Sequence, residues 1–302
     1  MDFTQRRVGI ITKVHERGIY FTAQAIVHHF NLDPVYLSVS SKQPENPEDF
    51  PMDRTTYYPD MGKISNAEKH RRRGECLLSW VKANDIDTVI GIESIYQPIE
   101  VIRPHVKTLI DWVDWEMIKI KHTPKFKYFD EFWFPTPKTA VCFSKLMKNR
   151  VVLDIDWAWD LPQMQLTDKS YDGVVRLYHG CGWGGLYDRK NTETILNAWK
   201  QLSPSDAVLY ITAQKKLDCL KNVPETVKIV TGSITREAVR RNYQSAHVYL
   251  GPSKREGLGL PMHESLKAGM ILVTTDAPPM NELSGRIVLV PVVRKKSVAG
   301  SY

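Results

Sequence analysis

Apolar and polar residues alternate along this chain in two distinct patterns. Short apolar runs predict buried strands at "RRVGIIT" (6–12), "DPVYLSVS" (33–40), "DTVIGIES" (87–94) and "VKTLIDWV" (106–113). Longer segments with apolar residues at helical spacing predict helices at "GIYFTAQAIVHHF" (18–30) and "NAEKHRRRGECLLSWVKAN" (66–84). This alternation of strands and helices indicates a parallel sheet that is covered by helices.

The second half of the chain shows the same alternation of predicted strands and helices. Strands are predicted at "VVRLYHG" (174–180), "AVLYIT" (207–212), "TVKIVTG" (226–232), "HVYLGPS" (247–253) and "MILVTT" (270–275). Helices are predicted at "KNTETILNAWKQL" (190–202), "TREAVRRNYQSA" (235–246) and "MHESLKAG" (262–269). We therefore predict a second α/β domain of the same kind.

A polar, turn-rich segment, "DIDWAWDLPQMQLTDKSYDG" (154–173), separates the two halves. We place the domain boundary there, with a first domain at residues 1–165 and a second at residues 166–302. Both are expected to be doubly wound α/β domains. Ligands of open α/β sheets bind outside the carboxyl ends of the strands, so we expect a site in a cleft between the domains.

Two further segments carry expectations about packing. Residues 41–60 are polar and contain four prolines, which predicts an irregular surface loop. Four aromatic residues lie close together in residues 129–134, and we expect them to pack in the core or between the domains.

Composition limits the possible classes of protein. Hydrophobic residues make up 42% and charged residues 25% of the 302 positions, as in soluble globular proteins. The net charge of +7 favours an anionic partner such as nucleotide phosphate, nucleic acid or an anionic membrane. Four scattered cysteines without a CxxC pair predict reduced thiols in a cytoplasmic protein. No signal peptide or membrane-spanning run is apparent, and no pattern indicates an oligomeric state.

The segment "EGLGLPMHESLKAG" (256–269) is the strongest candidate for a site. Gly257 and Gly259 permit positive φ angles and close approach of a ligand to the backbone. Glu264 is expected in the first helical turn, where free N–H groups attract anions. Carboxylates accept hydrogen bonds from hydroxyls, so Glu256 and Glu264 on either side of a phosphate site suit a nucleotide sugar. A solvated helix start is the alternative for Glu264, because the helix dipole alone favours a glutamate there.

This segment has a family resemblance. Residues 247–283, "HVYLGPSKREGLGLPMHESLKAGMILVTTDAPPMNEL", resemble the donor-binding segment of family 4 retaining glycosyltransferases of the GT-B fold. That family carries two glutamates separated by seven residues, after Pro-Ser and around Gly-x-Gly. Residues 227–246 and 188–202 are also similar, and residues 154–160 resemble the family's hinge strand. The similarity covers about residues 172–284, whereas the first half is similar mainly in its rhythm.

The resemblance implies two Rossmann-like domains that face each other across a cleft, and transfer of a hexose from a nucleotide sugar such as UDP-glucose with retention of configuration. Lys190 and Arg189 would bind the diphosphate, Glu256 the sugar hydroxyls and Glu264 the ribose. The backbone of Gly257, Leu258 and Gly259 would follow the sugar and phosphate, and the loop at Arg17 and Gly18 would close over the phosphates. Cys181 stands where the family has an arginine, so Arg189 or Arg255 is expected to supply the second cation.

The acceptor is less defined. The family often has a histidine after a first-domain strand, and here Asp111 and Asp114 stand in that stretch, where either could orient or deprotonate a hydroxyl or cap a loop. Basic residues of the first domain form a solvated surface or bind nucleic acid: Arg71, Arg72, Arg73, Lys125 and Lys127. A hydroxymethylated base in DNA is therefore one candidate acceptor. A glycan or lipid-linked acceptor, or a non-catalytic nucleotide-sugar-binding module, is the alternative.

No metal or cofactor is expected besides the donor. The Asp-x-Asp pattern at residues 154–156 matches a metal motif of other glycosyltransferases, but the GT-B resemblance implies that cations and helix dipoles stabilise the leaving group. "GCGWGG" (180–185) lacks the spacing of a dinucleotide-binding motif.

Overall fold

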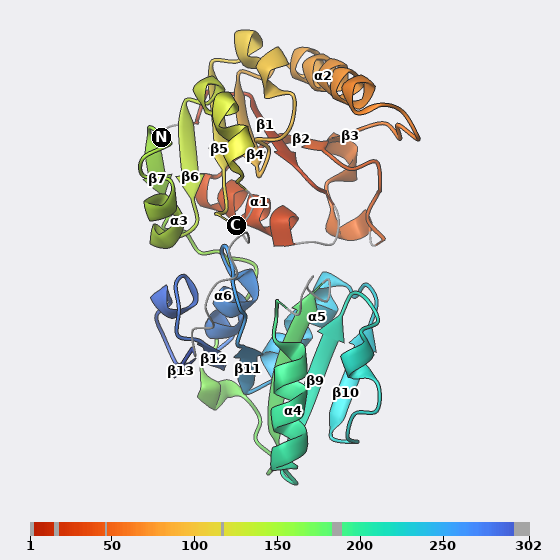
Figure 1. Ribbon diagram of the computed structural model, residues 1–302, viewed down its shortest axis with the longest axis vertical. Coiled ribbons are helices and arrows are strands. Elements are labelled where there is room, and N and C mark those ends of the chain that lie inside the picture. Colours follow the sequence, from red (N-terminus) through yellow and green to blue (C-terminus); the bar gives the residue numbers. More distant parts are fainter. Residues whose placement is uncertain (1–2, 15–17, 46, 116–117, 183–188, 293–302) are drawn as a thin grey trace. The chain divides into compact units, whose positions relative to one another are not determined.

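The computed structural model describes residues 3–14, 18–45, 47–115, 118–182 and 189–292 (Figure 1). The chain divides into two compact units between Trp157 and Ala158. The sequence analysis places this boundary at about residue 165, within the segment that leads to the second sheet. Each unit is built around its own parallel sheet.

The described part of the first unit contains a seven-stranded parallel sheet with the strand order β3-β2-β1-β4-β5-β6-β7. Its strands are β1 (Val8–Thr12), β2 (Val35–Ser38), β3 (Thr55–Tyr57), β4 (Thr88–Ile92), β5 (Thr108–Trp112), β6 (Glu131–Phe134) and β7 (Arg150–Val152). The chain builds β1 to β3 towards one edge and β4 to β7 towards the other. The direction of winding therefore reverses between β1 and β4, where Ile11 lies opposite Gly91.

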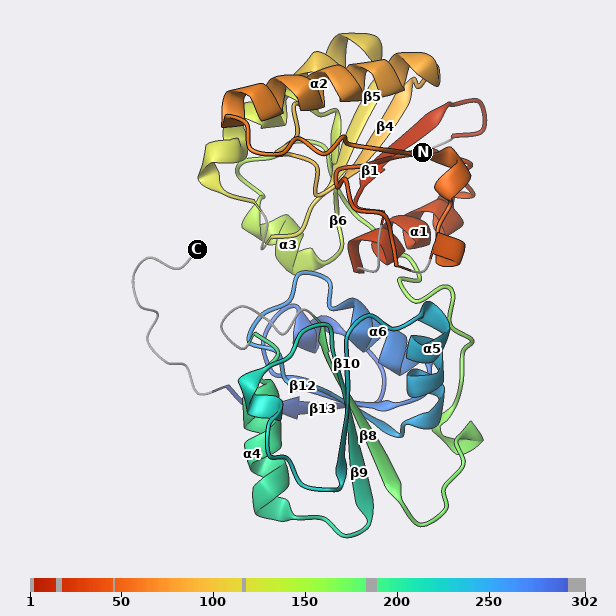
Figure 2. The same ribbon diagram turned by 90° about the vertical axis from the view of Figure 1, so that its right-hand side faces the viewer.

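Helices cover both faces of this sheet. They are α1 (Gly18–Phe30), α2 (Asn66–Ala83) and the short α3 (Pro137–Cys142). Figure 2 shows α1 and α2 on opposite sides of the strands. Ser65 caps α2 by accepting a hydrogen bond from the Glu68 amide. Gly9 makes room for α2, because a Cβ atom there would lie 2.5 Å from the ring of Trp80.

Two predictions about the first unit are wrong in part. The loop expected at residues 41–60 ends in strand β3, whose pairing with β2 extends the sheet by one edge strand. The strand expected at residues 154–160 is absent, and residues 157–160 form a turn. Buried side chains anchor this turn, since Trp157 packs against Trp112 and Asp160 binds Arg236. The aromatic residues of 129–134 are buried in the core, as expected.

The described part of the second unit contains a six-stranded parallel sheet with the strand order β10-β9-β8-β11-β12-β13. Its strands are β8 (Val175–Gly182), β9 (Ala207–Ala213), β10 (Val227–Thr231), β11 (Val248–Gly251), β12 (Ile271–Thr275) and β13 (Ile287–Val290). Every strand except β13 is predicted by the sequence pattern. The winding reverses between β8 and β11, where Tyr178 lies opposite Tyr249.

Three helices cover the second sheet: α4 (Thr192–Leu202), α5 (Arg236–Ser245) and α6 (Leu260–Lys267). Figure 2 shows α4 on one side of the strands and α5 on the other. Two separate apolar clusters reflect this arrangement. Ile195 and Trp199 of α4 pack with Leu209 on one face, while Tyr243 of α5 and Met262 of α6 belong to the cluster on the other. The doubly wound α/β architecture predicted for each half is confirmed.

None of the helices in the described ranges is long and apolar enough to cross a membrane. Short 3-10 helices complete the connections: η1 (Pro47–Asp49), η2 (Met52–Arg54), η3 (Ile99–Val101), η4 (Arg103–His105), η5 (Ile120–Tyr128), η6 (Leu166–Asp168), η8 (Asp218–Leu220) and η9 (Met280–Glu282).

Candidate functional site

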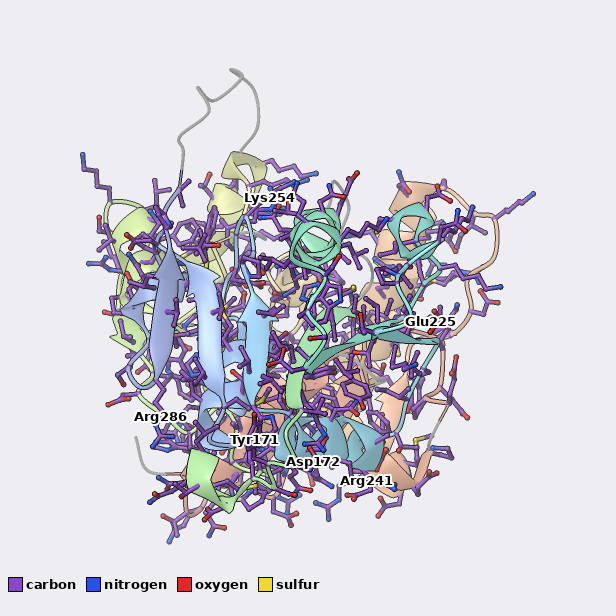
Figure 3. All side chains as sticks on the ribbon, turned by 90° about the horizontal axis from the view of Figure 1, so that it is seen from below. Tyr171, Asp172, Glu225, Arg241, Lys254 and Arg286 are labelled. Atoms are coloured by element: carbon purple, nitrogen blue, oxygen red, sulfur yellow. The ribbon has the colours of Figure 1, made fainter. Side chains whose placement is uncertain are left out.

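The carboxyl ends of β8 and β11 meet at the point where the second sheet reverses its winding. Such a switch point is the usual ligand site of an open α/β sheet. In Figure 3 Lys254 lies at the carboxyl end of β11, and Tyr171, Asp172 and Arg286 lie at the opposite end of the sheet. The residues that follow these two strands therefore form the candidate site.

A buried ion cluster occupies this switch point. Glu256 is only 4% exposed. One of its oxygens, Oε1, lies 2.5 Å from the Lys190 ammonium, and Oε2 lies 2.7 Å from the Arg189 guanidinium. Three residues that the sequence assigned to the donor site are thus in direct contact.

Electrostatics keep this glutamate ionised. Burial alone would raise the pKa of Glu256, but Lys190 and Arg189 hold it below its ordinary value. A buried charge pair is stable only while both partners remain, because an uncompensated buried charge is costly. An anionic ligand that approaches the cluster could replace the carboxylate as the partner of the two cations.

Backbone contacts hold the two loops of the cluster together. Asn191 adopts a left-handed conformation, with φ 55°, and its side-chain amide donates a 2.6 Å hydrogen bond to the Pro252 carbonyl. The Lys254 amide donates to the Arg189 carbonyl at 2.8 Å. Arg189 donates in turn to the carbonyl of Arg255, whose side chain is exposed. The loop after β11 is therefore tied to the start of α4.

The glycine loop leads directly into α6. Gly257, Leu258 and Gly259 are all buried. Gly259 has φ 74°, and a side chain there would be strained as well as crowded by Met262. Because α6 begins at Leu260, Glu264 is its fifth residue, and the prediction that it lies in the first turn is wrong.

Glu264 belongs to a second buried ion cluster. It is 3% exposed, which contradicts the alternative of a solvated helix start. Its Oε1 lies 2.6 Å from the guanidinium of Arg236 on α5. Arg236 also makes two parallel 2.8 Å hydrogen bonds to Asp160. Although burial opposes ionisation of Asp160, Arg236 lowers its pKa below the ordinary value.

Three tyrosines form a buried aromatic cluster near the two glutamates. The rings of Tyr178, Tyr243 and Tyr249 pack at centroid distances of 5.3–5.9 Å. The pKa of Tyr249 is raised well above its ordinary value by burial, with further contributions from Tyr178, Glu256 and Glu264. Both glutamates therefore act on one phenol.

The structure places the first-domain candidates in the other unit. Asp111, on β5, is 0% exposed, and its Oδ1 accepts hydrogen bonds from the Ser94 amide at 3.0 Å and the Ser94 hydroxyl at 2.8 Å. Burial raises the pKa of Asp111 to about 8. Asp114 follows β5 and is 8% exposed. Their contact with an acceptor stays a prediction.

The loop expected to close over the phosphates is described only in part. Gly18 is the exposed first residue of α1, and Arg17 lies outside the described residues.

All five basic residues proposed for nucleic acid have contacts within the first unit. On α2, Arg71 forms ion pairs with Glu68 and Glu75, and Arg72 pairs with Glu68. Arg73 lies over the Tyr58 ring, and Lys127 lies over the Tyr128 ring. Lys125 donates a hydrogen bond to the Gln97 carbonyl, and its ammonium lies 3.6 Å from the Glu100 carboxylate. The charge of this surface is thus partly balanced locally.

The sequence analysis missed the second ion cluster's other members. Arg236 and Asp160 are 76 positions apart. Both lie in segments that resemble the family, but the resemblance assigned neither residue a role in the site. The arginine begins a helix and the aspartate lies in a turn, where charged residues are usually solvated. Only the packing of α5 on the sheet brings them together.

Comparison with known proteins adds two findings. Residues 181–299 match the family model described as "Glycosyl transferases group 1". No curated protein sequence matches the chain.

Similar solved structures span almost the entire chain. HepE from Anabaena, in complex with UDP and glucose, is 9% identical with a TM-score of 0.71, covering 95% of this chain and 86% of that one. Sucrose-phosphate synthase from Thermosynechococcus elongatus is 12% identical with a TM-score of 0.65 and the same two coverages, 95% and 86%. UDP-GlcNAc 2-epimerase from Methanocaldococcus jannaschii is 11% identical with a TM-score of 0.62, covering 94% and 89%. Identities this low establish the fold, and the reaction has to be argued from the site.

The family match covers the residues that carry the Lys190–Glu256 cluster and both glutamates of the "EGLGLPMHE" motif. The chain has the GT-B fold, and its residues 181–299 carry the sequence pattern of the Glycosyl transferases group 1 family.

Proposed function

We propose that this protein is a retaining glycosyltransferase that moves a hexose from a nucleotide sugar, with UDP-glucose as the first donor to test, to a hydroxyl acceptor. The observation that carries this proposal is the buried contact of Glu256 with Lys190 and Arg189 at the switch point of the second sheet. The UDP and glucose named for HepE, which has the same fold, support this choice of donor.

Donor binding would exchange one anion for another. The diphosphate takes over Lys190 and Arg189, and Glu256 becomes free to accept hydrogen bonds from the sugar hydroxyls. Glu264, oriented by Arg236, binds the ribose. The desolvated donor site thereby uses the same cations first to hold a carboxylate and then to hold the phosphates.

The transfer step needs no covalent intermediate on the protein. The bond between the sugar's anomeric carbon and the phosphate oxygen breaks, and its electron pair stays on the diphosphate. The acceptor oxygen forms its bond on the same face of the sugar and passes its proton to the departing phosphate oxygen. Lys190 stabilises the developing charge, which is why we propose leaving-group stabilisation by cations instead of a metal.

The test is transfer from labelled UDP-glucose by Lys190→Ala and Glu256→Ala, with Lys221→Ala as an exposed control in the same unit. We expect the first two variants to lose about 10²–10³ in kcat/KM, the usual cost of removing a charge-stabilising group. NMR of the product should show the same anomeric configuration as the donor. Unchanged turnover in both site variants would falsify the assignment.

For the acceptor we propose a hydroxymethylated base in DNA as the first candidate. The net charge of +7 favours this acceptor. The ion pairs of Arg71 and Arg72 with Glu68 on α2 are evidence against a basic surface available to the DNA backbone. A screen should compare hydroxymethylated DNA, unmodified DNA, glycans and lipid-linked acceptors. Binding to DNA should weaken with salt and with simultaneous replacement of Arg71, Arg72 and Arg73 by alanine. Activity only on a glycan or lipid-linked acceptor would overturn the DNA proposal.

A nucleotide-sugar epimerase is the second candidate, because a UDP-GlcNAc 2-epimerase shares the fold. An epimerase needs no acceptor and exchanges the C2 proton of the sugar with solvent. Incubation of UDP-GlcNAc in D₂O separates the two reactions: deuterium at C2 supports the epimerase, and its absence together with acceptor-dependent release of UDP supports the transferase. UDP binding without either reaction would indicate a non-catalytic module.

A further inference from the structure

One buried serine in the candidate donor site has a hydroxyl that makes no hydrogen bond. Ser253 lies just after β11, which ends at Gly251, and it is 1% exposed. Among the described residues, no hydrogen-bond partner exists for its Oγ. Buried polar groups are nearly always hydrogen-bonded, so an exception beside a candidate ligand site calls for a functional explanation.

Backbone contacts fix the position of this serine. Its amide donates a hydrogen bond to the Gly251 carbonyl at 2.8 Å, and its carbonyl accepts one from the Thr275 hydroxyl at 2.7 Å. The neighbouring carbonyl of Pro252 and amide of Lys254 are hydrogen-bonded to the residues just before α4. Ser253 therefore cannot turn its hydroxyl out to solvent without breaking contacts on both sides of it.

The hydroxyl of Ser253 acts on Glu256. Burial opposes ionisation of Glu256, while Lys190 and Arg189 hold its pKa below the ordinary value. The Ser253 hydroxyl contributes to the same lowering, and the buried Tyr249 phenol on β11 also interacts with this carboxylate. Each oxygen of Glu256 contacts one of the two cations. The hydroxyl is thus near a carboxylate that the cations now occupy.

Donor binding would take these cations away from the carboxylate. In the proposed exchange the diphosphate becomes the partner of Lys190 and Arg189. A buried carboxylate that loses its cations is unstable and takes up a proton unless another donor satisfies it. A protonated Glu256 has less capacity to accept hydrogen bonds from sugar hydroxyls. Ser253 is a donor that stays beside Glu256 during the exchange, because its backbone is fixed.

We propose that Ser253 is a positioning residue that donates a hydrogen bond to Glu256 when the donor diphosphate takes over Lys190 and Arg189. This inference rests on the proposed function and adds a residue to its donor site. Ser253 keeps the released carboxylate ionised, so that its other lone pairs accept from the sugar hydroxyls. The hydroxyl proton stays on Ser253, and no covalent bond forms.

The proposal predicts a loss of affinity in Ser253→Ala that depends on pH. Without the hydroxyl, the pKa of Glu256 in the complex is higher than in the unmodified chain. Above both pKa values the variant should bind UDP about tenfold more weakly, the usual value of a hydrogen bond to a charged group. Below both values Glu256 is protonated in either complex, so the two affinities should converge as the pH falls.

Calorimetric titration of the whole chain with UDP, from about pH 6 to about pH 9, measures this convergence. Titration of UDP itself is common to all variants and cancels in the ratio of affinities. Ser265→Ala is the matched control, because Ser265 is 0% exposed in the same unit and its hydroxyl donates to the Met262 carbonyl at 2.8 Å. It should bind UDP with the same pH dependence as the unmodified chain.

Two further variants separate a role in positioning from a role in folding. In the double variant Ser253→Ala, Glu256→Gln the pH-dependent part of the loss should disappear, because no carboxylate is left to protonate. If Ser253→Ala does not fold, Ser253→Cys replaces it, with a smaller loss expected because a thiol is a weak donor.

The possible results lead to different conclusions. Unchanged affinity, or a loss that is equal at every pH, overturns this inference alone. A pH-dependent loss that persists in the Glu256→Gln background overturns it as well. Absence of UDP binding by the unmodified chain overturns the proposed function itself.

Discussion

Replacement of Asp111 by asparagine should remove a pH dependence from the stability of the first unit. Burial raises the pKa of this carboxyl from 3.8 to about 8, so the folded protein keeps the proton over a pH range in which the unfolded chain has released it. Stability from this group is complete below pH 4 and is lost as the pH rises towards 8. Asparagine resembles the protonated acid in shape and can still accept hydrogen bonds from Ser94.

The size of the effect follows from the width of that window. Each pH unit between the two pKa values changes the free energy of unfolding by about 1.4 kcal/mol. Between pH 5 and pH 7 the wild-type protein should therefore lose about 2–3 kcal/mol relative to Asp111→Asn. The quantity to compare is the difference in unfolding free energy between wild type and Asp111→Asn. The titration of histidines and other carboxyls is the same in both proteins and cancels in this difference.

Urea unfolding at pH 5, 6, 7 and 8, followed by tryptophan fluorescence, measures this difference. Asp53→Asn removes an exposed aspartate from the same unit and controls for a simple change of charge. A stability difference between wild type and Asp111→Asn that stays constant from pH 5 to pH 7 would refute the reasoning. It would mean that Asp111 is ionised in the folded protein in spite of its burial.

Three further substitutions test the remaining buried contacts. Arg236→Ala removes the cation that pairs with buried Glu264 and the bidentate partner of Asp160, which keeps its contact with Arg240. It should cost about 3–5 kcal/mol in urea unfolding, so a loss below 1 kcal/mol would contradict the ion cluster. Glu256→Gln should tighten UDP binding up to about tenfold, or about 1.4 kcal/mol, in calorimetry, because Lys190 no longer has to leave a carboxylate; weaker binding would show that the glutamate itself holds the nucleotide. Gly91→Ala should destabilise the protein by about 1–3 kcal/mol, since the new methyl group overlaps Ser94, and an unchanged melting temperature would show that the turn after β4 can shift.

Secondary structure and the segment that carries the candidate donor site could be read from the sequence because both depend on residues that are close in sequence. The apolar run before Glu256 specifies a buried strand, and the glycines after it specify a turn that a helix follows. These local rules held for nearly every element of the second unit. They failed at β3 and at residues 154–160, where pairing with β2 and contacts of Trp157 and Asp160 outweigh local preference.

The sequence by itself determined the alternation of strands and helices, and the candidate donor residues Lys190, Glu256 and Glu264. The tertiary structure alone decided which charges meet. Glu264 binds Arg236, because strand order and helix packing bring distant positions together. Burial makes these contacts important for stability, because a charge removed from water is stable only beside an oppositely charged partner. The local sequence pattern does not show which residue that partner is.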